Sequence, residues 1–223
     1  MIHLLAGLRA RRSDAATAYR KARPAPADTP WREAAFSVVD LETTGLDARR
    51  DEIISFAAIP IDDGRVAVGR MRMAIVRPRH MPDAETIRIH GLRPDDLADA
   101  PPLHDVLGVV LDSLAGRVLV AHAAWVERSF LAAALRPAGL RMSAPVLDTS
   151  VLARHVLEEK RVGDRETIRL SDAVERLGLP VHRPHHADGD ALTTAQLFLA
   201  LAIQLDAVEP QTVGSLARLS ALG

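Results

Sequence analysis

Two carboxylates on a short apolar segment are the clearest chemical signal in this chain. Asp40 and Glu42 lie two positions apart in the run FSVVDLETTG, which spans residues 36–45. Side chains alternate between the two faces of a strand, so both carboxylates point to the same side. Two like charges on an apolar strand repel each other and lose hydration, which is tolerated mainly when a cation lies between them. The segment therefore predicts half of a divalent-metal site. The alternative is an exposed edge strand whose polar face is acidic.

Two later segments offer further acids for such a site. Glu127 follows a short apolar strand that ends at His122, and the carboxyl end of a strand is where α/β sheets bind ligands. On local evidence alone, Glu127 is better explained as an ordinary acid in the first turn of a helix. Asp190 ends the run HHADGD, residues 185–190, and is expected to open the long helix that follows. An Asp at a helix start is most often an N-cap, but a loop this rich in titratable groups is typical of an active site.

The composition is that of an ordinary globular protein and excludes several kinds of chemistry. The 223 residues are 48% hydrophobic and 26% charged, with a formal net charge of -1. This balance argues against a large basic nucleic-acid surface but leaves room for a local basic cleft. The absence of cysteine removes disulfides, thiolate catalysis and cysteine-ligated zinc, and the remaining oxygen and imidazole ligands favour Mg²⁺ or Mn²⁺. No apolar stretch is expected to span a bilayer, so a cytoplasmic location is the default expectation.

The elements that must position these acids are expected to form one α/β domain with short flanking segments. Residues 1–34 are expected to form an amphipathic helix and a Pro-rich connector. The apolar side of that helix would carry Leu4, Leu5, Leu8 and Ala15. Residues 35–205 would form the main domain, and residues 206–223 a peripheral C-terminal helix with frayed ends.

Within the main domain, a meander of strands is followed by alternating helices and strands. Strands are expected at 36–41 and 52–61, then, after the turn signal DDGR at 62–65, a third strand ending near residue 76. Helices are expected at 84–90, 103–114, 126–134, 149–159, 170–177 and 191–205, with further strands at 116–122 and 145–147. This order indicates a mixed α/β sheet, an antiparallel three-strand meander continued by parallel strands and flanked by helices.

Several short motifs occur in an order that resembles the DEDDh, or DnaQ-like, 3′–5′ exonucleases, the family of the proofreading epsilon subunit of bacterial DNA polymerase III. The matching blocks are VDLETTGL from residue 39, IHGL from residue 89, HAAWVERSFL from residue 122, VLDT from residue 146 and HHADGDA from residue 185. The resemblance implies a ribonuclease H-like fold for residues 35–205. It also implies metal-dependent hydrolysis of phosphodiester bonds at the 3′ end of single-stranded DNA or RNA, with release of nucleoside 5′-monophosphates.

The resemblance assigns a role to each candidate site residue. Two divalent cations, Mg²⁺ or Mn²⁺, would be held by Asp40, Glu42, Glu127 and Asp190. His185 would be the general base that takes a proton from the attacking water, and His186 is the alternative if the loop register is shifted by one. Contacts with the substrate would come from Thr43, Thr44, His122 and Trp125.

For some of these residues, a structural role is the alternative to contact with the substrate. His122 is also suited to bracing a loop through hydrogen bonds, and Trp125 to packing against its own helix rather than stacking on a base. Asp148 lies at a strand-to-helix junction and is expected to cap the helix that follows.

Glu127 is the main departure from the family pattern. The family has Asp at this position after a phenylalanine, and an asparagine where this chain has Ala123. The extra methylene moves the carboxylate outward by about one bond, and Mg²⁺ is strict about geometry. Two alternatives therefore stay open. One is a nucleic-acid-binding module of the same fold with weakened catalysis. The other is a phosphodiesterase for short oligonucleotides, which the near-zero net charge favours.

The expected partners are single-stranded DNA or RNA 3′ ends and, through the terminal segments, a polymerase or another protein, but no membrane. The sequence does not separate DNA from RNA as the substrate. Nor does it separate proofreading from DNA repair as the process.

Overall fold

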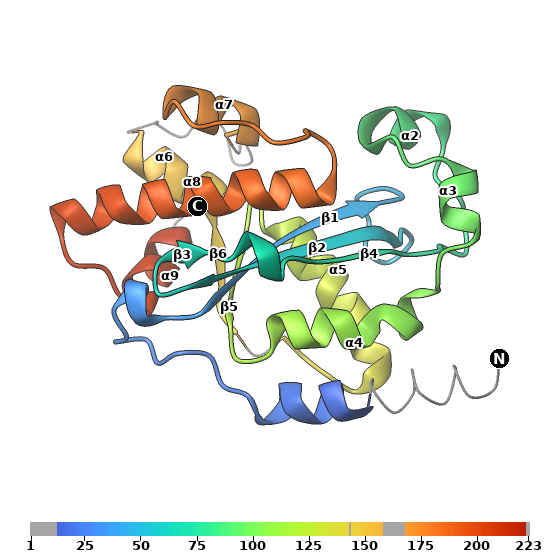
Figure 1. Cartoon of the computed structure of the whole chain (residues 1–223), viewed down its shortest axis with the longest axis horizontal. Helices are drawn as coiled ribbons and strands as arrows, with labels where there is room; N and C mark the ends of the chain where they lie inside the picture. Colours follow the sequence, from blue (N-terminus) through green and yellow to red (C-terminus); the bar gives the residue numbers. More distant parts are fainter. Residues whose placement is uncertain (1–12, 143, 158–167, 222–223) are drawn as a thin grey trace.

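A six-stranded mixed sheet forms the centre of the computed structural model (Figure 1). The structure describes residues 13–142, 144–157 and 168–221. The strand order is β3-β2-β1-β5-β6, and β4 also pairs with β2. β1 (Phe36–Thr43) is antiparallel to β2 (Ile53–Asp62) and parallel to β5 (Val118–Ala121), which is parallel to β6 (Val146–Asp148). The expected mixed α/β sheet, with a meander continued by parallel strands, is confirmed.

The third strand of the expected meander is interrupted. β3 (Arg65–Val66) pairs with the end of β2, β4 (Arg72–Ile75) pairs with its middle, and the 3-10 turn η2 (Val68–Arg70) separates them. Residues of η2 are exposed, so no buried face holds the chain extended at this point. The turn before β3 is the predicted tight hairpin, with Asp63 at φ 50° and Gly64 at φ 65°.

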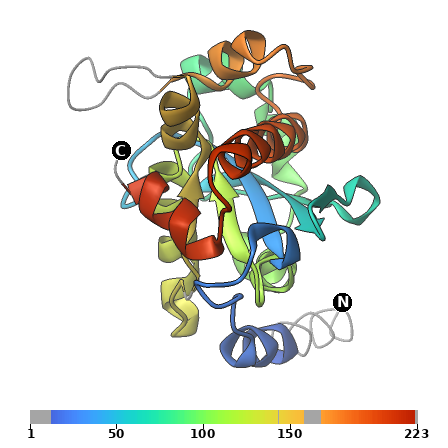
Figure 2. The same cartoon turned by 90° about the vertical axis from the view of Figure 1, so that its left-hand side faces the viewer.

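Helices cover both faces of the sheet (Figures 1 and 2). They are α2 (Ala84–His90), α3 (Pro94–Ala98), α4 (Leu103–Leu114), α5 (Trp125–Leu135), α6 (Thr149–Val156), α7 (Leu170–Arg176), α8 (Ala187–Val208) and α9 (Val213–Ala221), with 3-10 turns η1 (Trp31–Glu33) and η3 (Arg136–Ala138). The bounds of α2 and α4 agree with the sequence prediction. α3 was not predicted, because five residues are too short to show a helical repeat.

Alternation along β1 divides the core between the two faces of the sheet. Phe36 and Val38 pack with residues of α6, α8 and α9, whereas Val39 and Leu41 pack with residues of α4 and α5. Because successive strand residues face opposite sides, Asp40 and Glu42 lie on the face of Val38, which α8 covers. The strand pattern that predicted a shared face for the two acids therefore also selects the helix they meet.

α8 differs from expectation in two ways. It begins at Ala187, so Asp190 lies within its first turn instead of opening it, and His186 is the N-cap residue. The helix has 22 residues and a window of mean hydropathy 1.5, long and apolar enough to span a membrane by composition alone. The expectation that no stretch reaches that length was wrong. α8 nevertheless packs on β1 and β2 and fully buries Leu197 and Phe198, as a core helix does.

The segments on both sides of the main domain pack onto it. In the helix through residues 13–21, Ala15 and Tyr19 are buried against the α4 and α5 side. The other residues expected on the apolar side of this helix, Leu4, Leu5 and Leu8, lie outside the described residues. α9 was expected to be peripheral, but Leu216 is fully buried in the core on the α8 side of the sheet. An isolated bridge between Pro30 and Thr212 joins the two flanking segments.

Candidate metal centre and catalytic site

Three carboxylates converge at the carboxyl end of β1 and the first turn of α8. One ligand oxygen from each of Asp40, Glu42 and Asp190 lies within 4.8 Å of the others. Oxygen ligands lie about 2.0–2.6 Å from Mg²⁺ or Ca²⁺, so oxygens that share one ion are separated by no more than about 5 Å. The three carboxylates therefore have the spacing that a divalent cation requires.

Burial raises the pKa of each of these carboxyl groups, and repulsion from neighbouring acids of the cluster adds to the shift for Asp40 and Glu42. Burial and the neighbouring charges of Glu127, Glu42 and Asp190 hold the pKa of Asp40 well above its usual range. Burial and the charge of Asp190 raise the pKa of Glu42 to about 7. Burial also raises the pKa of Asp190. Like charges forced together in a poorly hydrated place are stabilised by a cation, so the electrostatics fit the same site as the geometry.

Glu127, in the first turn of α5, lies near enough to raise the pKa of Asp40, but it is not one of the three residues whose oxygens lie within 4.8 Å of one another. Its side chain is only 4% exposed, and its Oε2 atom is buried without a hydrogen-bond partner among the described residues. Burial and the charges of Asp148 and Glu42 raise the pKa of Glu127 to about 8. An ordinary first-turn acid would be solvated, whereas a buried carboxylate oxygen without a partner calls for a ligand. The three grouped acids, all hard oxygen donors, therefore fit Mg²⁺ or Mn²⁺, and Glu127 offers a further buried carboxylate beside them.

Asp148 fixes the turn that places Glu127. Its Oδ1 atom accepts the N–H of Ala123 at 3.1 Å, and its Oδ2 atom accepts the N–H of Ala124 at 2.9 Å. Ala123 has φ 55°, a left-handed conformation that alanine rarely adopts, so the turn needs such support. The backbone N–H of Asp148 itself donates to Ser220 Oγ on α9.

The predicted helix cap at Asp148 is confirmed, because its side chain also accepts the N–H of Ser150 at 2.8 Å. Its contact with the turn before α5 was not foreseen. The turn lies 25 residues earlier in the chain, and no local pattern reports such a contact.

His185, the predicted general base, lies on an exposed loop beside the cluster. Its backbone N–H donates to Asp190 Oδ2 at 2.9 Å, and its φ of 60° is again in the left-handed region. The side chain is exposed to solvent. His186 is half-buried at the start of α8, where its charge lowers the pKa of the nearby His90 side chain after the larger effect of burial. Asp190 holds the backbone of both histidines: its carboxylate accepts the N–H of His185, and its own N–H donates to the carbonyl of His186 at 2.9 Å.

α8 holds the loop that carries His185 at two points that the sequence did not reveal. Thr193 Oγ1 accepts the N–H of His182 at 3.0 Å and donates to the carbonyl of Gly189 at 2.9 Å. A Cβ atom at position 189 would lie 2.2 Å from the carbonyl oxygen of His182 and 2.4 Å from that of Arg183. The loop can approach the helix this closely only because residue 189 is glycine.

The hydroxyls of Thr43 and Thr44, predicted to contact the substrate, are used within their own turn. Thr43 Oγ1 donates to the carbonyl of Gly45 at 2.6 Å, and Thr44 Oγ1 lies 3.4 Å from Asp51 Oδ1. The same Asp51 carboxylate accepts the N–H of Asp47 at 2.8 Å, which closes the loop after β1. The two threonines therefore shape the edge of the site, and their hydroxyl hydrogens are already committed.

His122 and Trp125 differ in how much of each side chain is available to a substrate. Both ring nitrogens of His122 are engaged, Nδ1 with Thr149 Oγ1 at 2.9 Å and Nε2 with the carbonyl of Ile168 at 2.7 Å. This arrangement favours the bracing role for His122. The Trp125 side chain is 51% exposed in the first turn of α5, so its indole ring is open to solvent.

Comparison with known proteins gives one family match and several relatives. Residues 37–198 match the model of a protein family described as Exonuclease. The chain is 33% identical over 173 residues to the PolC-type DNA polymerase III of Thermotoga petrophila. It is 34% identical over 199 residues to a DNA polymerase III subunit epsilon-like protein of Rhodobacter capsulatus. These matches cover 77% and 88% of this chain, but only 12% and 28% of the two relatives.

Solved structures share the fold. Exonuclease X in complex with 5′ overhanging duplex DNA has a TM-score of 0.64 at 22% identity, covering 83% of this chain and 99% of that one. Escherichia coli exonuclease I in complex with a dT13 oligonucleotide has a TM-score of 0.64 at 16% identity, covering 78% and 42%. The expected ribonuclease H-like exonuclease fold is thereby confirmed.

Proposed function

This chain belongs to the exonuclease family, and from that membership we propose that it removes nucleotides from the 3′ end of single-stranded nucleic acid as 5′-monophosphates. The observation that carries the proposal is the acidic cluster. Three carboxylate oxygens lie within 4.8 Å of one another, beside a fourth buried acid with an oxygen that has no partner among the described residues. Residues 35–205 would form the catalytic domain, in keeping with the family match over 37–198.

The acids would hold two divalent cations, Mg²⁺ or Mn²⁺. The holding residues would be Asp40, Glu42, Glu127 and Asp190. When bound, such ions stabilise negative charge on the phosphate and lower the pKa of coordinated water. The chain itself would supply the fixed positions of the carboxylates, because β1 presents two of them on one face and the brace at Asp148 holds α5 in place.

His185 would accept the proton of the attacking water. Histidine is the side chain used most often for this task, and here it stays in contact with solvent, to which it can pass the proton on. Asp190 supports the assignment to His185, because its carboxylate accepts the backbone N–H of that residue. One carboxylate thus contributes to the acidic cluster and also fixes the loop of the base.

Trp125 would stack on a base near the 3′ end. Stacking on an aromatic ring tolerates any base, as removal of successive nucleotides requires. Single-stranded DNA is the favoured substrate, because the relatives are named as DNA polymerase III proteins and the solved neighbours contain DNA. The same relatives make a DNA polymerase the favoured protein partner.

The test is degradation of an oligonucleotide that carries a label at its 5′ end. With Mg²⁺ or Mn²⁺ the protein should shorten it stepwise from the 3′ end. Asp40→Asn should abolish shortening without loss of circular dichroism, and Asp112→Asn, at an exposed position of α4, should leave it unchanged. Folded protein that shortens neither DNA nor RNA with either metal would refute the proposal.

The competing function is a nucleic-acid-binding module that has lost its metal. The observation that favours this alternative is Glu127, which stands where the family pattern has aspartate. Calorimetric titration with Mn²⁺ separates the two functions. The exonuclease should bind the ion with a stoichiometry of about two, the number in a two-metal site, whereas the module should show no tight binding.

A further inference from the structure

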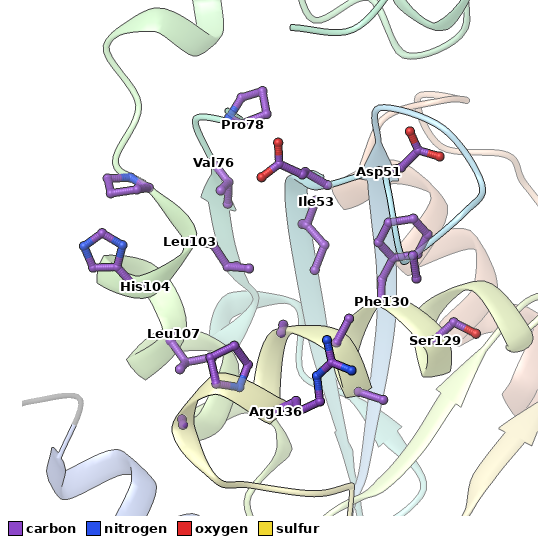
Figure 3. A pocket seen from close by; sticks show the side chains of 18 of the residues that line it. Asp51, Ile53, Val76, Pro78, Leu103, His104, Leu107, Ser129, Phe130 and Arg136 are labelled. Atoms are coloured by element: carbon purple, nitrogen blue, oxygen red, sulfur yellow. The ribbon is translucent and has the colours of Figure 1, made fainter. Parts of the chain in front are cut away.

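A hollow of about 1200 Å³ lies on the side of the sheet that α4 and α5 cover (Figure 3). Its walls are α4, α5, the loop between β1 and β2, and the helix through residues 13–21. Apolar side chains that line it include Ile53, Val76, Leu103, Leu107 and Phe130. None of the four acids of the candidate metal centre lines this hollow, so it is a separate feature of the surface.

The hollow is locally basic in a chain that is nearly neutral. Five arginines and three acids line it, an excess of two positive charges, whereas the whole chain carries a formal charge of -1. The arginines are Arg20, Arg49, Arg77, Arg79 and Arg136. The hollow is therefore a local basic cleft, a feature that the near-zero net charge of the chain does not exclude.

Most of this positive charge is not neutralised by an ion pair. Within the described residues, Arg79 pairs with Glu52 at 2.9 Å, and the other four arginines form no ion pair. The guanidinium groups of Arg49 and Arg136 also donate no hydrogen bond to a described residue. Figure 3 shows the Arg136 side chain pointing into the hollow. Asp51, one of the three acids, is turned into its own loop, where it accepts hydrogen bonds.

The hollow adjoins the end of β1, on the opposite face of the sheet from Asp40 and Glu42. Ile53, in the hollow, is the direct cross-strand partner of Thr43 at the end of β1. Leu46, whose side chain is 66% exposed, lines the hollow from the loop that follows β1. On α5, Ser129 lies one turn after Trp125 and also lines the hollow. A strand leaving the site past Trp125 would therefore enter the hollow along α5.

We propose that this hollow binds the single-stranded segment of nucleic acid that lies upstream of the 3′ terminus. Its phosphates would contact Arg49 and Arg136, and its bases would cover the apolar floor. The proposal rests on the proposed exonuclease function. An acidic protein segment would also match the charge, but the position of the hollow beside the end of β1 favours the substrate strand.

The length of α5 sets the length of strand that can reach Arg136. Arg136 follows Trp125 by eleven positions, or about 16 Å at roughly 1.5 Å per helical residue. A stacked strand advances about 3.4 Å per phosphate, so about five nucleotides cover this distance. Shorter oligonucleotides would occupy the catalytic site alone. The proposal therefore separates a polymer-degrading enzyme from a phosphodiesterase for very short oligonucleotides.

The test measures binding of fluorescein-labelled oligothymidylates of three to twelve nucleotides, by anisotropy with a chelator present so that no cleavage occurs. Affinity for the unmodified protein should rise sharply near about five nucleotides. The double variant Arg49→Ala/Arg136→Ala should bind the dodecamer at least about tenfold more weakly and the trimer equally well. Its slope of log affinity against log salt should fall by about 1.4, because each lost phosphate contact on a single strand removes about 0.7.

Arg65→Ala is the matched control. Arg65 is exposed on β3, away from the hollow, and should leave the length profile unchanged. A double variant that binds the dodecamer as tightly as the unmodified protein overturns the proposal. Cleavage of the trimer distinguishes failure of the proposed binding track from failure of the proposed exonuclease function. If both proteins still shorten the trimer with Mn²⁺ while the dodecamer affinities are equal, the exonuclease function stands and only the binding track fails.

Discussion

Replacing Glu127 by glutamine should stabilise the metal-free protein at alkaline pH, although it removes a predicted metal ligand. In the folded protein, burial and the charges of Asp148 and Glu42 raise the pKa of Glu127 from 4.5 to about 8. Because the pKa of Glu127 is raised only in the folded state, its carboxyl group ionises less readily in the folded protein than in the unfolded chain. Its contribution to stability is therefore complete below about pH 4.5 and is lost as the pH rises through about 8.

The size of the effect follows from the pKa shift. One pKa unit corresponds to about 1.36 kcal/mol, so moving Glu127 from 4.5 to about 8 corresponds to a loss on the order of 5 kcal/mol by pH 9. Glutamine has nearly the same shape but no charge to bury. The difference in unfolding free energy between the variant and the natural protein should be only about 1 kcal/mol at pH 5. It should grow steadily in favour of the variant toward pH 9.

Urea denaturation followed by circular dichroism at pH 5, 7 and 9, with a chelator present, measures this difference. Glu209→Gln makes the same chemical change at an exposed position after α8 and should show no such growth with pH. Mn²⁺ at about 100 times its dissociation constant should add about 2.7 kcal/mol to the natural protein, and less to the Glu127 variant. A free-energy difference that is the same at all three pH values would refute the inference that this carboxylate is buried among like charges.

Substitutions at three further positions test separate parts of the site. Glu127→Asp should weaken Mn²⁺ binding in a calorimetric titration, because it withdraws by about one bond a buried carboxylate that lies beside the three grouped acids; a large gain in activity would instead mark glutamate as a weakened ligand. Gly189→Ala should lower kcat at least about tenfold with little change in Mn²⁺ affinity, because the new Cβ displaces the loop that carries His185 at His182; unchanged kcat would contradict the close approach. Trp125→Ala should weaken oligonucleotide binding by about 1–3 kcal/mol and Trp125→Phe by less, and equal affinities would rule out stacking.

The strand that carries Asp40 and Glu42 could be predicted from the sequence because the pattern that specifies it is local. A strand repeats every two residues, so Asp40 and Glu42 had to share a face, and the apolar residues between and before them had to be buried. The same holds for α4, whose twelve residues show a clear helical repeat and whose bounds agree with the prediction. Ordered motifs with the spacing of a known family added the partners of the two acids, and the family match confirmed that family.

The parts that sequence could not supply depend on contacts between distant segments. Glu127 looks like an ordinary first-turn acid until Asp148, from another strand, is seen to hold the turn before α5. The start of α8 was misplaced because the run before Asp190 contains glycine and acids, which are poor helix formers without tertiary support. Leu216 is buried although its helix is short and terminal. In each case the deciding free energy comes from packing or hydrogen bonds that no local pattern records.

The hydrogen bond from Asp148 to Ser220 gives the C-terminal helix a mechanical connection to the candidate catalytic site. Ser220 holds the backbone of Asp148, and Asp148 holds the turn on which Glu127 depends. Force applied to the end of α9, by an affinity tag, a surface tether or a fused protein, would therefore be transmitted to a candidate metal ligand through two hydrogen-bonded steps.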